Sequence, residues 1–462
     1  MARPDPMIDF AELDPQNSGG GLRATFFHLG VIRILRRLNL LHKVTHVISV
    51  SGGSIAATQL VRHWKLYTGT PDQFDAAQSD LLSLRDWDIR GNVLRRALLW
   101  WPIYFLSLRF PQYLSRLRVG RTELLNREYD RYFGGLTLDG LRRSSEGSPQ
   151  FHLVSTNLVT GSICSFTKRH YVIAEDGQLK PYSAELTKVS MAVTASSAFP
   201  PVFPPIRFDE SMTGGKSGAF RGYSHFLTDG GVYDNTGYES AALLETDLKS
   251  KGTKLGDLII VSDAGSPFQW RYDSEFTNPF SLAARASEIV MNRVAEEMLK
   301  RIVSQERIAL VSIDDIDEDD SLSPMIQRAT SRIRTDLDRF SAIEVAALVT
   351  HGENKAARQL QRHSQINSNV TPSSTTTNVF PIQLPPAEEV AGGLSKSWQL
   401  RWWNSFTNFS DWRTALIYLI ALALLVGPTI GITAAFSYWV KQLEQKSAAQ
   451  AAAMRKRRPS VS

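Results

Sequence analysis

The chain has 462 residues, of which 43% are hydrophobic, and it carries a formal net charge of +6. Single hydrophobic cores stop growing at roughly 250–300 residues, so this length predicts one sizeable domain with appended segments. The modest charge does not indicate a nucleic-acid partner. The single cysteine, Cys164, excludes an intrachain disulfide and a multi-cysteine zinc site. Met1 to Ser18 is polar, and we expect no signal peptide there.

The first informative element is the glycine turn Ser18-Gly19-Gly20-Gly21, which precedes a helical pattern beginning near Leu22. Consecutive glycines ahead of a helix let backbone N–H groups converge, and the helix dipole favours a negative charge at that point. The turn therefore predicts an anion-binding loop. The anion could be a nucleotide phosphate or the oxyanion of acyl transfer, and a plain flexible turn is the alternative. No Gly-Lys-Ser/Thr follows, which disfavours a nucleotide P-loop.

The second element is a strand-to-helix corner with Ser51 at its apex. Residues 45–50 are rich in β-branched side chains, and a helical pattern follows from Ser54. This arrangement is typical of a nucleophile elbow, in which small neighbours let the serine sit in a tight turn. Ser49 stands where the commonest version of the motif has glycine. A serine that only caps the following helix is the alternative.

The third element is Asp229, which is followed by two glycines after the short run Tyr223–Leu227. It could be a simple turn residue, because Asp and Gly favour turns. As an active-site group, Asp229 would accept the proton of Ser51 directly. His225 is the residue to consider if a histidine stood between them, and Asp263, at the end of the apolar run 258–261, is an alternative acid.

Short apolar runs alternate with helical patterns up to about Gln361. This alternation predicts an α/β fold with a largely parallel central sheet flanked by helices. Because sites in such sheets lie at the carboxyl ends of strands, we expect the three turns to meet there.

Together these turns resemble the patatin-like phospholipases, and the wording Ser-Gly-Gly-Gly-x-Arg-Ala is similar to that of the related group IV cytosolic phospholipases. The resemblance runs from about Ser18 to Gly352 and includes the stretch 195–200. It implies a three-layer α/β/α fold and a serine lipid acyl-hydrolase that needs no cofactor or metal. It implies that Ser51 is the nucleophile and that Asp229 is its base. It also implies that Gly20 and Gly21, with Gly52, donate hydrogen bonds to the oxyanion, and that Arg23 steadies the loop or contacts lipid phosphate.

The chain departs from this family before the glycine turn, where the family has a hydrophobic strand. Residues 11–17 are polar, and Pro15 is a poor residue for a central strand. Met7–Phe10 is a short substitute, and an incomplete N-terminus is the alternative.

The rest of the chain divides by composition. We expect an acyl-hydrolase domain over 1–362, a flexible Ser/Thr/Pro-rich linker over 363–398, a juxtamembrane aromatic segment and transmembrane helix over 399–440, and a basic tail over 441–462. The span itself, 414–440, contains no Asp, Glu, Lys or Arg. We expect this helix to anchor the protein by a single pass. The basic residues after the span favour a cytoplasmic C-terminus, which would place the large domain outside. Because we expect no signal that would export this domain, we place the catalytic domain on the cytoplasmic side.

A further apolar segment, 94–118, combines Trp100 and Trp101 with basic flanks such as Arg95 and Arg96. It is too short to span a bilayer, and it is typical either of an element lying in the headgroup region or of a core segment. The sequence thus predicts a membrane-associated serine hydrolase acting on phospholipids or other acyl lipids. A thioesterase or transacylase with the same dyad, or a catalytically silent lipid-binding adaptor, are the alternatives.

Overall fold

The computed structural model describes residues 20–109, 120–200, 202–214, 220, 222–253, 255–265, 279–362, 386–395, 397, 405–408 and 411–456. The strands are β1 His46–Val50, β2 Gln150–Asn157, β3 Ser162–Phe166, β4 His170–Glu175, β5 Gln178–Ser183, β6 Ile206–Phe208, β7 His225–Asp229, β8 Ile259–Asp263 and β9 Ile308–Ser312. The α-helices are α1 Gly21–Arg37, α2 Gly53–Arg62, α3 Trp64–Tyr67, α4 Pro71–Leu82, α5 Ile89–Arg109, α7 Arg121–Phe133, α8 Leu138–Ser144, α9 Val189–Ser197, α10 Tyr238–Ser250, α11 Pro279–Val303, α12 Pro324–Ser331, α13 Ala342–Arg362, α15 Ala387–Ser395 and α16 Trp412–Lys456.

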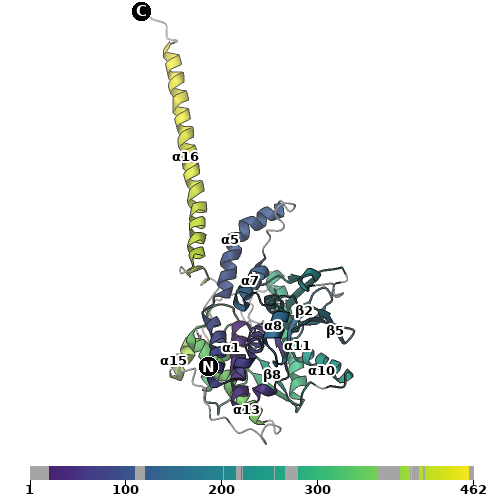
Figure 1. Cartoon of the computed structure of the whole chain (residues 1–462). Coiled ribbons are helices and arrows are strands. Elements are labelled where there is room, and N and C mark those ends of the chain that lie inside the picture. The colour runs from purple at the N-terminus through teal and green to yellow at the C-terminus, as the bar shows by residue number, and fades with distance from the viewer. Residues whose placement is uncertain are drawn as a thin grey trace, which may run out of the picture.

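The prediction of an α/β fold with a central sheet and flanking helices is confirmed (Figure 1). The prediction that this sheet is largely parallel is wrong. Its order is β5-β4-β3-β2-β7-β6, and β1 also pairs with β2. Among the described strands of this sheet, β1 and β2 are parallel and the other pairs are antiparallel.

The antiparallel pairing follows from the turns between β2 and β5. Parallel neighbours need a crossover of a dozen or more residues, whereas β2 to β5 are joined by short turns. The turn between β4 and β5 is Asp176-Gly177, and both residues have positive φ, of 52° and 73°. Such a two-residue turn fits the twist of an antiparallel hairpin.

A second, two-stranded parallel sheet is formed by β8 and β9. Helix α1 lies between this sheet and α2, and its apolar residues, including Phe26, Phe27 and Leu29, are fully buried. Helix α13 packs along α1. The expected helix that follows the glycine turn is thereby confirmed as a central element of the core.

Part of the predicted linker belongs to the folded domain. Residues 387–395 form α15, in which Val390 and Leu394 are buried in the main core against α12 and α13. The earlier part of the predicted linker, 363–385, lies outside the described residues. The apolar residues of α15 explain its folding, because they cover core surface that a polar linker would leave exposed.

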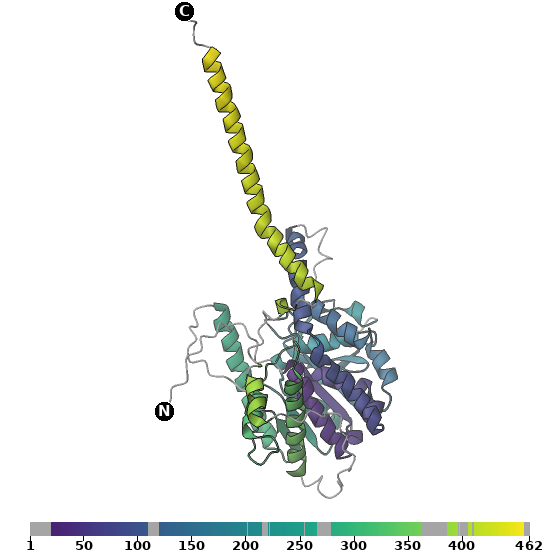
Figure 2. The ribbon, with the colours of Figure 1, turned by 90° about the vertical axis from the view of Figure 1, so that its left-hand side faces the viewer.

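Helix α16 is 45 residues long and projects from the domain (Figures 1 and 2). The predicted transmembrane helix, 414–440, lies within it, but no helix in the described ranges has the length and apolarity needed to cross a bilayer. That prediction is therefore not supported. The first turn of α16 is instead part of the domain, since Thr414 is fully buried and Arg413 donates a hydrogen bond to Asn92 of α5. The basic tail beyond Lys456 lies outside the described residues.

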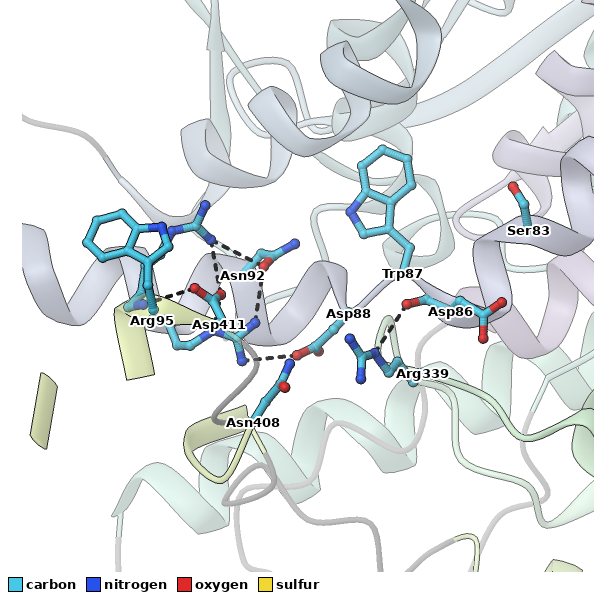
Figure 3. Close-up of a pocket in the computed structure, with 11 residues that line it drawn as sticks. Ser83, Asp86, Trp87, Asp88, Asn92, Arg95, Arg339, Asn408 and Asp411 are labelled. Atoms are coloured by element: carbon cyan, nitrogen blue, oxygen red, sulfur yellow. Dashed lines mark hydrogen bonds and ion pairs between the residues drawn. The ribbon is translucent and has the colours of Figure 1, made fainter. Parts of the chain in front are cut away.

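A polar junction holds α5 against the segment that begins α16, and its residues surround a pocket of about 480 Å³ (Figure 3). Arg95 is 1% exposed and lies at its centre, where Nε donates to Asp411 at 2.8 Å and Nη1 donates to Asp88 at 3.0 Å. Asn92 accepts a further hydrogen bond from Arg95. The charges of the junction are thus paired with one another, and these pairs hold α5 against the start of α16.

Candidate functional site

Strands β1 and β7 both pair with the same edge of β2, and their carboxyl ends meet there. Strand β1 runs parallel to β2 up to the pair Val50 and Val154. Strand β7 runs in the opposite direction and ends at the pair Asp229 and Ser155. Because Val154 and Ser155 are adjacent, the register brings the residue after β1, which is Ser51, next to Asp229. The backbone pairing alone therefore brings these two turns together, as expected.

Ser51 has the backbone conformation of a strained turn. Its φ is 52°, which is uncommon for a residue other than glycine, and its side chain is 3% exposed. The N–H of Ser51 donates to the carbonyl oxygen of Ser196 at 3.0 Å, which fixes this conformation from α9. The following helix, α2, begins at Gly53. Strand, strained serine and helix together have the geometry of a nucleophile elbow.

Hydroxyl groups fill the space behind the elbow. Ser54 shares one hydrogen bond with Ser49, at 3.2 Å, and another with Ser196, at 2.8 Å. Ser196 Oγ also accepts from the N–H of Ser51 at 3.2 Å. Ser49, the departure from the commonest elbow, is therefore accommodated because its hydroxyl has a partner.

Asp229 is fully buried, and a hydrogen bond satisfies only one of its two carboxyl oxygens. Oδ1 accepts a hydrogen bond from Gly231 N–H at 2.7 Å, while Oδ2 lacks a partner of standard hydrogen-bond geometry in the described structure. Burial raises the pKa of Asp229 from 3.8 to about 7, against the opposing effects of Gly231 and of a hydrogen-bond interaction with the Ser51 hydroxyl. An acid that titrates near neutral pH is well matched to proton transfer.

The glycine loop lies directly against the elbow. Gly20 and Gly21 have φ of 113° and 43°, values that other residues rarely adopt. A Cβ placed on Gly52 would lie 1.9 Å from the carbonyl oxygen of Gly21. Thr25 joins the two turns, since its hydroxyl donates to the Gly52 carbonyl oxygen at 2.9 Å. The three predicted oxyanion residues are thus neighbours of Ser51, and α1 begins at the same point.

Arg23 is buried beneath the loop. Its guanidinium donates to the carbonyl oxygens of Ser331, Ile333 and Ala264, at the end of α12 and after β8. Burial lowers its pKa to about 10, and Asp314 and Asp263 oppose that shift, so the group stays charged at neutral pH. Of the two roles that the family resemblance implies, this geometry corresponds to steadying the loop.

The other candidates lie elsewhere. His225 is four residues from Asp229 along β7, which is about 13 Å in a strand, and its ring shares a hydrogen bond with the Tyr171 hydroxyl. Asp263 accepts from Gly265 N–H at 2.8 Å and faces Arg23 rather than Ser51. Cys164 is buried, and burial raises its pKa to about 12. Within the described ranges, no group of three or more His, Cys, Asp or Glu side chains is arranged to hold a metal ion.

Two residues near the dyad were not identified as site residues from sequence. Ser196 supports the elbow as described above, and Tyr129 of α7 accepts a hydrogen bond from Ser197 at 3.3 Å and feels the charge of Asp229. The resemblance of the stretch 195–200 to the family indicates from sequence that this stretch lies near the site. No sequence pattern indicates a role for Tyr129, because its position depends on how α7 packs on α9.

Comparison with known sequences agrees with this geometry. Residues 18–242 match the family described as patatin-like phospholipase. The chain carries a patatin-like phospholipase domain. The matched range contains the glycine loop, the elbow and the Asp229 turn. No curated protein matches the chain in sequence.

The solved structures that are similar to this chain have low sequence identity to it. VipD from Legionella pneumophila is 13% identical, with 76% of this chain and 67% of that chain covered and a TM-score of 0.30. Human GIVD cytosolic phospholipase A2 in complex with methyl gamma-linolenyl fluorophosphonate is 14% identical, with 79% of this chain covered and a TM-score of 0.40. The aligned part spans 60% of the human phospholipase chain.

Proposed function

We propose that this chain hydrolyses acyl esters of phospholipids or other lipids through a dyad of Ser51 and Asp229. The observation that carries the proposal is the meeting of β1 and β7 on β2, which puts a strained serine beside a buried carboxyl of raised pKa. A serine that only capped a helix would need neither of these features. A hydroxyl next to a base is the arrangement that nucleophilic acyl transfer requires.

In the proposed reaction, Ser51 Oγ forms a bond to the ester carbonyl carbon as its proton passes to Asp229. Backbone N–H groups of Gly20, Gly21 and Gly52 hold the resulting oxyanion. The tetrahedral intermediate then breaks its bond to the alcohol or lysolipid, which leaves with the proton from Asp229. A water molecule, deprotonated by the same carboxylate, attacks the acyl-enzyme, and the fatty acid is released as Ser51 regains its proton.

Labelling by a fluorophosphonate probe tests this proposal, because the probe forms a covalent bond only with an activated serine. We expect wild type to be labelled and Ser51→Ala to show neither labelling nor release of fatty acid from a chromogenic ester. Ser190→Ala is the matched control, since Ser190 is also buried but lies in α9 beside Asp130. Labelling that persists in Ser51→Ala would refute the assignment, and wild type without any label would favour a lipid-binding adaptor.

The acyl substrate is the second part of the proposal. The dyad would also support a thioesterase or a transacylase, because the acyl-enzyme is the same and only the leaving group or the acceptor differs. Profiling wild type against phospholipids, acyl thioesters and acyl acceptors at equal concentration distinguishes them. A higher kcat/KM for phospholipid or acylglycerol esters than for thioesters supports the ester hydrolase.

We further propose that the protein meets its lipid surface through the projecting end of α5, within the segment 94–118. Leu98 is 39% exposed and Trp100 is partly exposed. Two of the arginines expected to attract headgroups are engaged inside the protein, since Arg95 lies in the polar junction and Arg96 pairs with Glu128. Apolar contact is thus the main contribution of this part of α5 to binding a lipid surface.

Replacing Trp100 and Trp101 with Ser should weaken binding to liposomes, measured by sedimentation of the full chain. Tyr223→Ser is the control, because Tyr223 is a well-exposed aromatic residue that lies outside α5 and outside the segment 399–440. Unchanged binding of the double variant would refute docking through α5.

A further inference from the structure

Ser155 lies directly opposite Asp229 in the central sheet. The two residues are partners in the antiparallel pairing of β2 with β7. Residues opposite each other in such a pair point to the same face, with their Cβ atoms about 4.5–5.5 Å apart, so these two side chains are neighbours. On its other edge β2 pairs with β3, where the partner of Ser155 is Cys164. Ser155 is therefore the middle one of three short side chains on this face.

Backbone contacts fix which residue stands opposite Asp229. The Thr156 hydroxyl donates to the Asp229 carbonyl oxygen at 3.0 Å. The N–H of Asp229 donates to the carbonyl oxygen of Ala198, which caps the end of α9, at 3.2 Å. A Cβ placed on Gly230 would lie 2.5 Å from the Val154 carbonyl oxygen, so β2 and the turn after β7 are in close contact. The register of this pair is thus held from three directions.

Both facing side chains carry a buried polar atom without a partner. Ser155 is fully buried, and its hydroxyl has no hydrogen-bond partner among the residues that the structure describes. Oδ2 of Asp229 is also buried and accepts no hydrogen bond of standard geometry from those residues. Such atoms are rare in folded proteins, because burial removes the water that would otherwise pair with them. Two of them on facing side chains indicate a hydrogen bond between the pair.

Rotation of the Ser155 side chain completes this bond. A serine side chain has three staggered positions about one bond, and its hydroxyl hydrogen turns to suit a partner. A carboxylate has about four acceptor sites. The bond from Gly231 and the interaction with the Ser51 hydroxyl leave room for one more donor on Asp229. Ser155 therefore does not compete with the proposed nucleophile for the carboxyl.

A hydroxyl suits this position because the proposed base changes its protonation state. Asp229 takes the proton of Ser51 and later returns it. A hydroxyl donates to the ionised carboxylate and accepts from the protonated acid, so Ser155 can pair with Asp229 in both states. The bond to the ionised form is the stronger of the two, because its acceptor is charged. Ser155 thus favours the form of Asp229 that can act as a base.

We propose that Ser155 is a positioning residue of the dyad, whose hydroxyl donates a hydrogen bond to ionised Asp229 and holds its carboxylate toward Ser51. This inference rests on the proposed function, in which Asp229 is the base. Ser155 keeps its own proton throughout the reaction and acts only through Asp229. Its contribution is to the population of the ionised base, rather than to the binding of substrate.

The other titratable groups near this face are neutral around neutral pH. Burial and the charge of Asp229 raise the pKa of Tyr129 on α7. Burial raises the pKa of Cys164 on β3 to about 12, and it lowers the pKa of His225 at the start of β7. Helix α9, which packs on β2 and β7, has no charged side chain. A pH profile near neutrality therefore reports on Asp229.

The pH profile of kcat/KM tests the role of Ser155. Ser155→Ala removes the hydroxyl without adding volume. We expect the apparent pKa of its profile to lie about one pH unit above that of wild type, because the ionised base loses a hydrogen bond. On the acid side of the profile kcat/KM should fall about tenfold, while KM stays unchanged and activity approaches that of wild type at high pH.

Ser145→Ala is the matched control. Ser145 also has a buried hydroxyl that lacks a partner in the described part of the chain, but it caps the end of α8. Its profile should coincide with that of wild type. A position that merely requires a small side chain would accept alanine as readily as serine, so identical profiles for wild type and Ser155→Ala would overturn the proposal.

The pair Ser155→Thr and Ser155→Val provides a second route in case the alanine variant does not fold. These two side chains have nearly the same shape, and both are favoured in strands, so any packing cost is shared and only the hydroxyl differs. The threonine variant should titrate like wild type, and the valine variant about one pH unit higher. Equal profiles for the two would refute the role of the hydroxyl.

Urea unfolding tests the same hydrogen bond without any use of catalysis. Ser155→Ala should lower the midpoint urea concentration more at pH 8, where Asp229 is ionised, than at pH 4, where it is protonated. In an Asp229→Asn background the effect should be the same at both pH values. This pH dependence in a chain that fluorophosphonate does not label would refute the proposed function and support the hydrogen bond. A labelled chain without it would refute the role of Ser155 alone.

Discussion

The substitution Asp229→Asn separates the contribution of the buried carboxyl to stability from its contribution to catalysis. The carboxyl ionises near pH 3.8 in the unfolded chain and near pH 7 in the folded protein, because burial disfavours its charge. Between these values the folded state holds a proton that the unfolded state releases, so folding becomes less favourable as the pH rises. The resulting penalty to folding is about 4 kcal/mol at pH 8, about 2 kcal/mol at pH 5 and less than about 1 kcal/mol at pH 4.

The amide introduced by this substitution does not titrate, and its oxygen can still accept the hydrogen bond from Gly231. We therefore expect Asp229→Asn to be more stable than wild type at pH 8 by up to about 4 kcal/mol, with the difference closing toward pH 4. Hydrolysis should fall by about 10²–10⁴-fold because the base is lost.

Urea unfolding of both proteins at pH 4, 5 and 8 measures the effect. Asp319→Asn is the control, because Asp319 is 90% exposed and should leave the curve unchanged. A variant that is less stable than wild type at pH 8, or a difference that does not depend on pH, would refute the argument that Asp229 is a buried and poorly compensated acid.

The remaining predictions concern the groups around Asp229. Between pH 6 and 8, kcat/KM should rise about tenfold as Asp229 ionises, and a profile flat over this range would exclude a base of pKa near 7. Gly52→Ala should lower stability by about 1–3 kcal/mol and abolish activity, since its Cβ meets a backbone oxygen, whereas Gly53→Ala should be mild because it meets only the edge of a side chain. Ser196→Ala should lower kcat with little change in KM, which steady-state kinetics will show. Arg23→Met should lower the free energy of unfolding by about 3 kcal/mol or more, with little change in the KM for an uncharged ester.

The three turns of the site could be predicted from sequence because each depends on local chemistry. Glycines at positive φ, a serine between a strand and a helix, and an aspartate before glycine are all visible within a few residues. Their mutual approach could be expected only from the resemblance to a family. What brings Ser51 to Asp229 is the pairing of β1 and β7 with β2, and residues 155 and 229 are too far apart in the chain for any local pattern to reveal their register.

The direction of the strands was missed for a related reason. Residues 153–157 of β2 are all buried because both faces of the sheet are covered, and burial on both faces is common to strands of either direction. The short Asp176-Gly177 turn is the local signal that favours an antiparallel hairpin. The helix α15 was assigned to a polar linker because its few apolar residues, Val390 and Leu394, stand out only when the core that they cover is known.

The joint of β1 and β7 on β2 has a consequence for how the enzyme could change. The separation of Ser51, the proposed nucleophile, from Asp229, its proposed base, depends on the main chain of Val154 and Ser155, so substitutions of the surrounding side chains should leave it unchanged. Substitutions of side chains around the site can therefore accumulate while Ser51 and Asp229 keep their separation. A single inserted residue between these two positions would instead shift Ser51 away from Asp229, so we expect this peptide bond to tolerate no insertion.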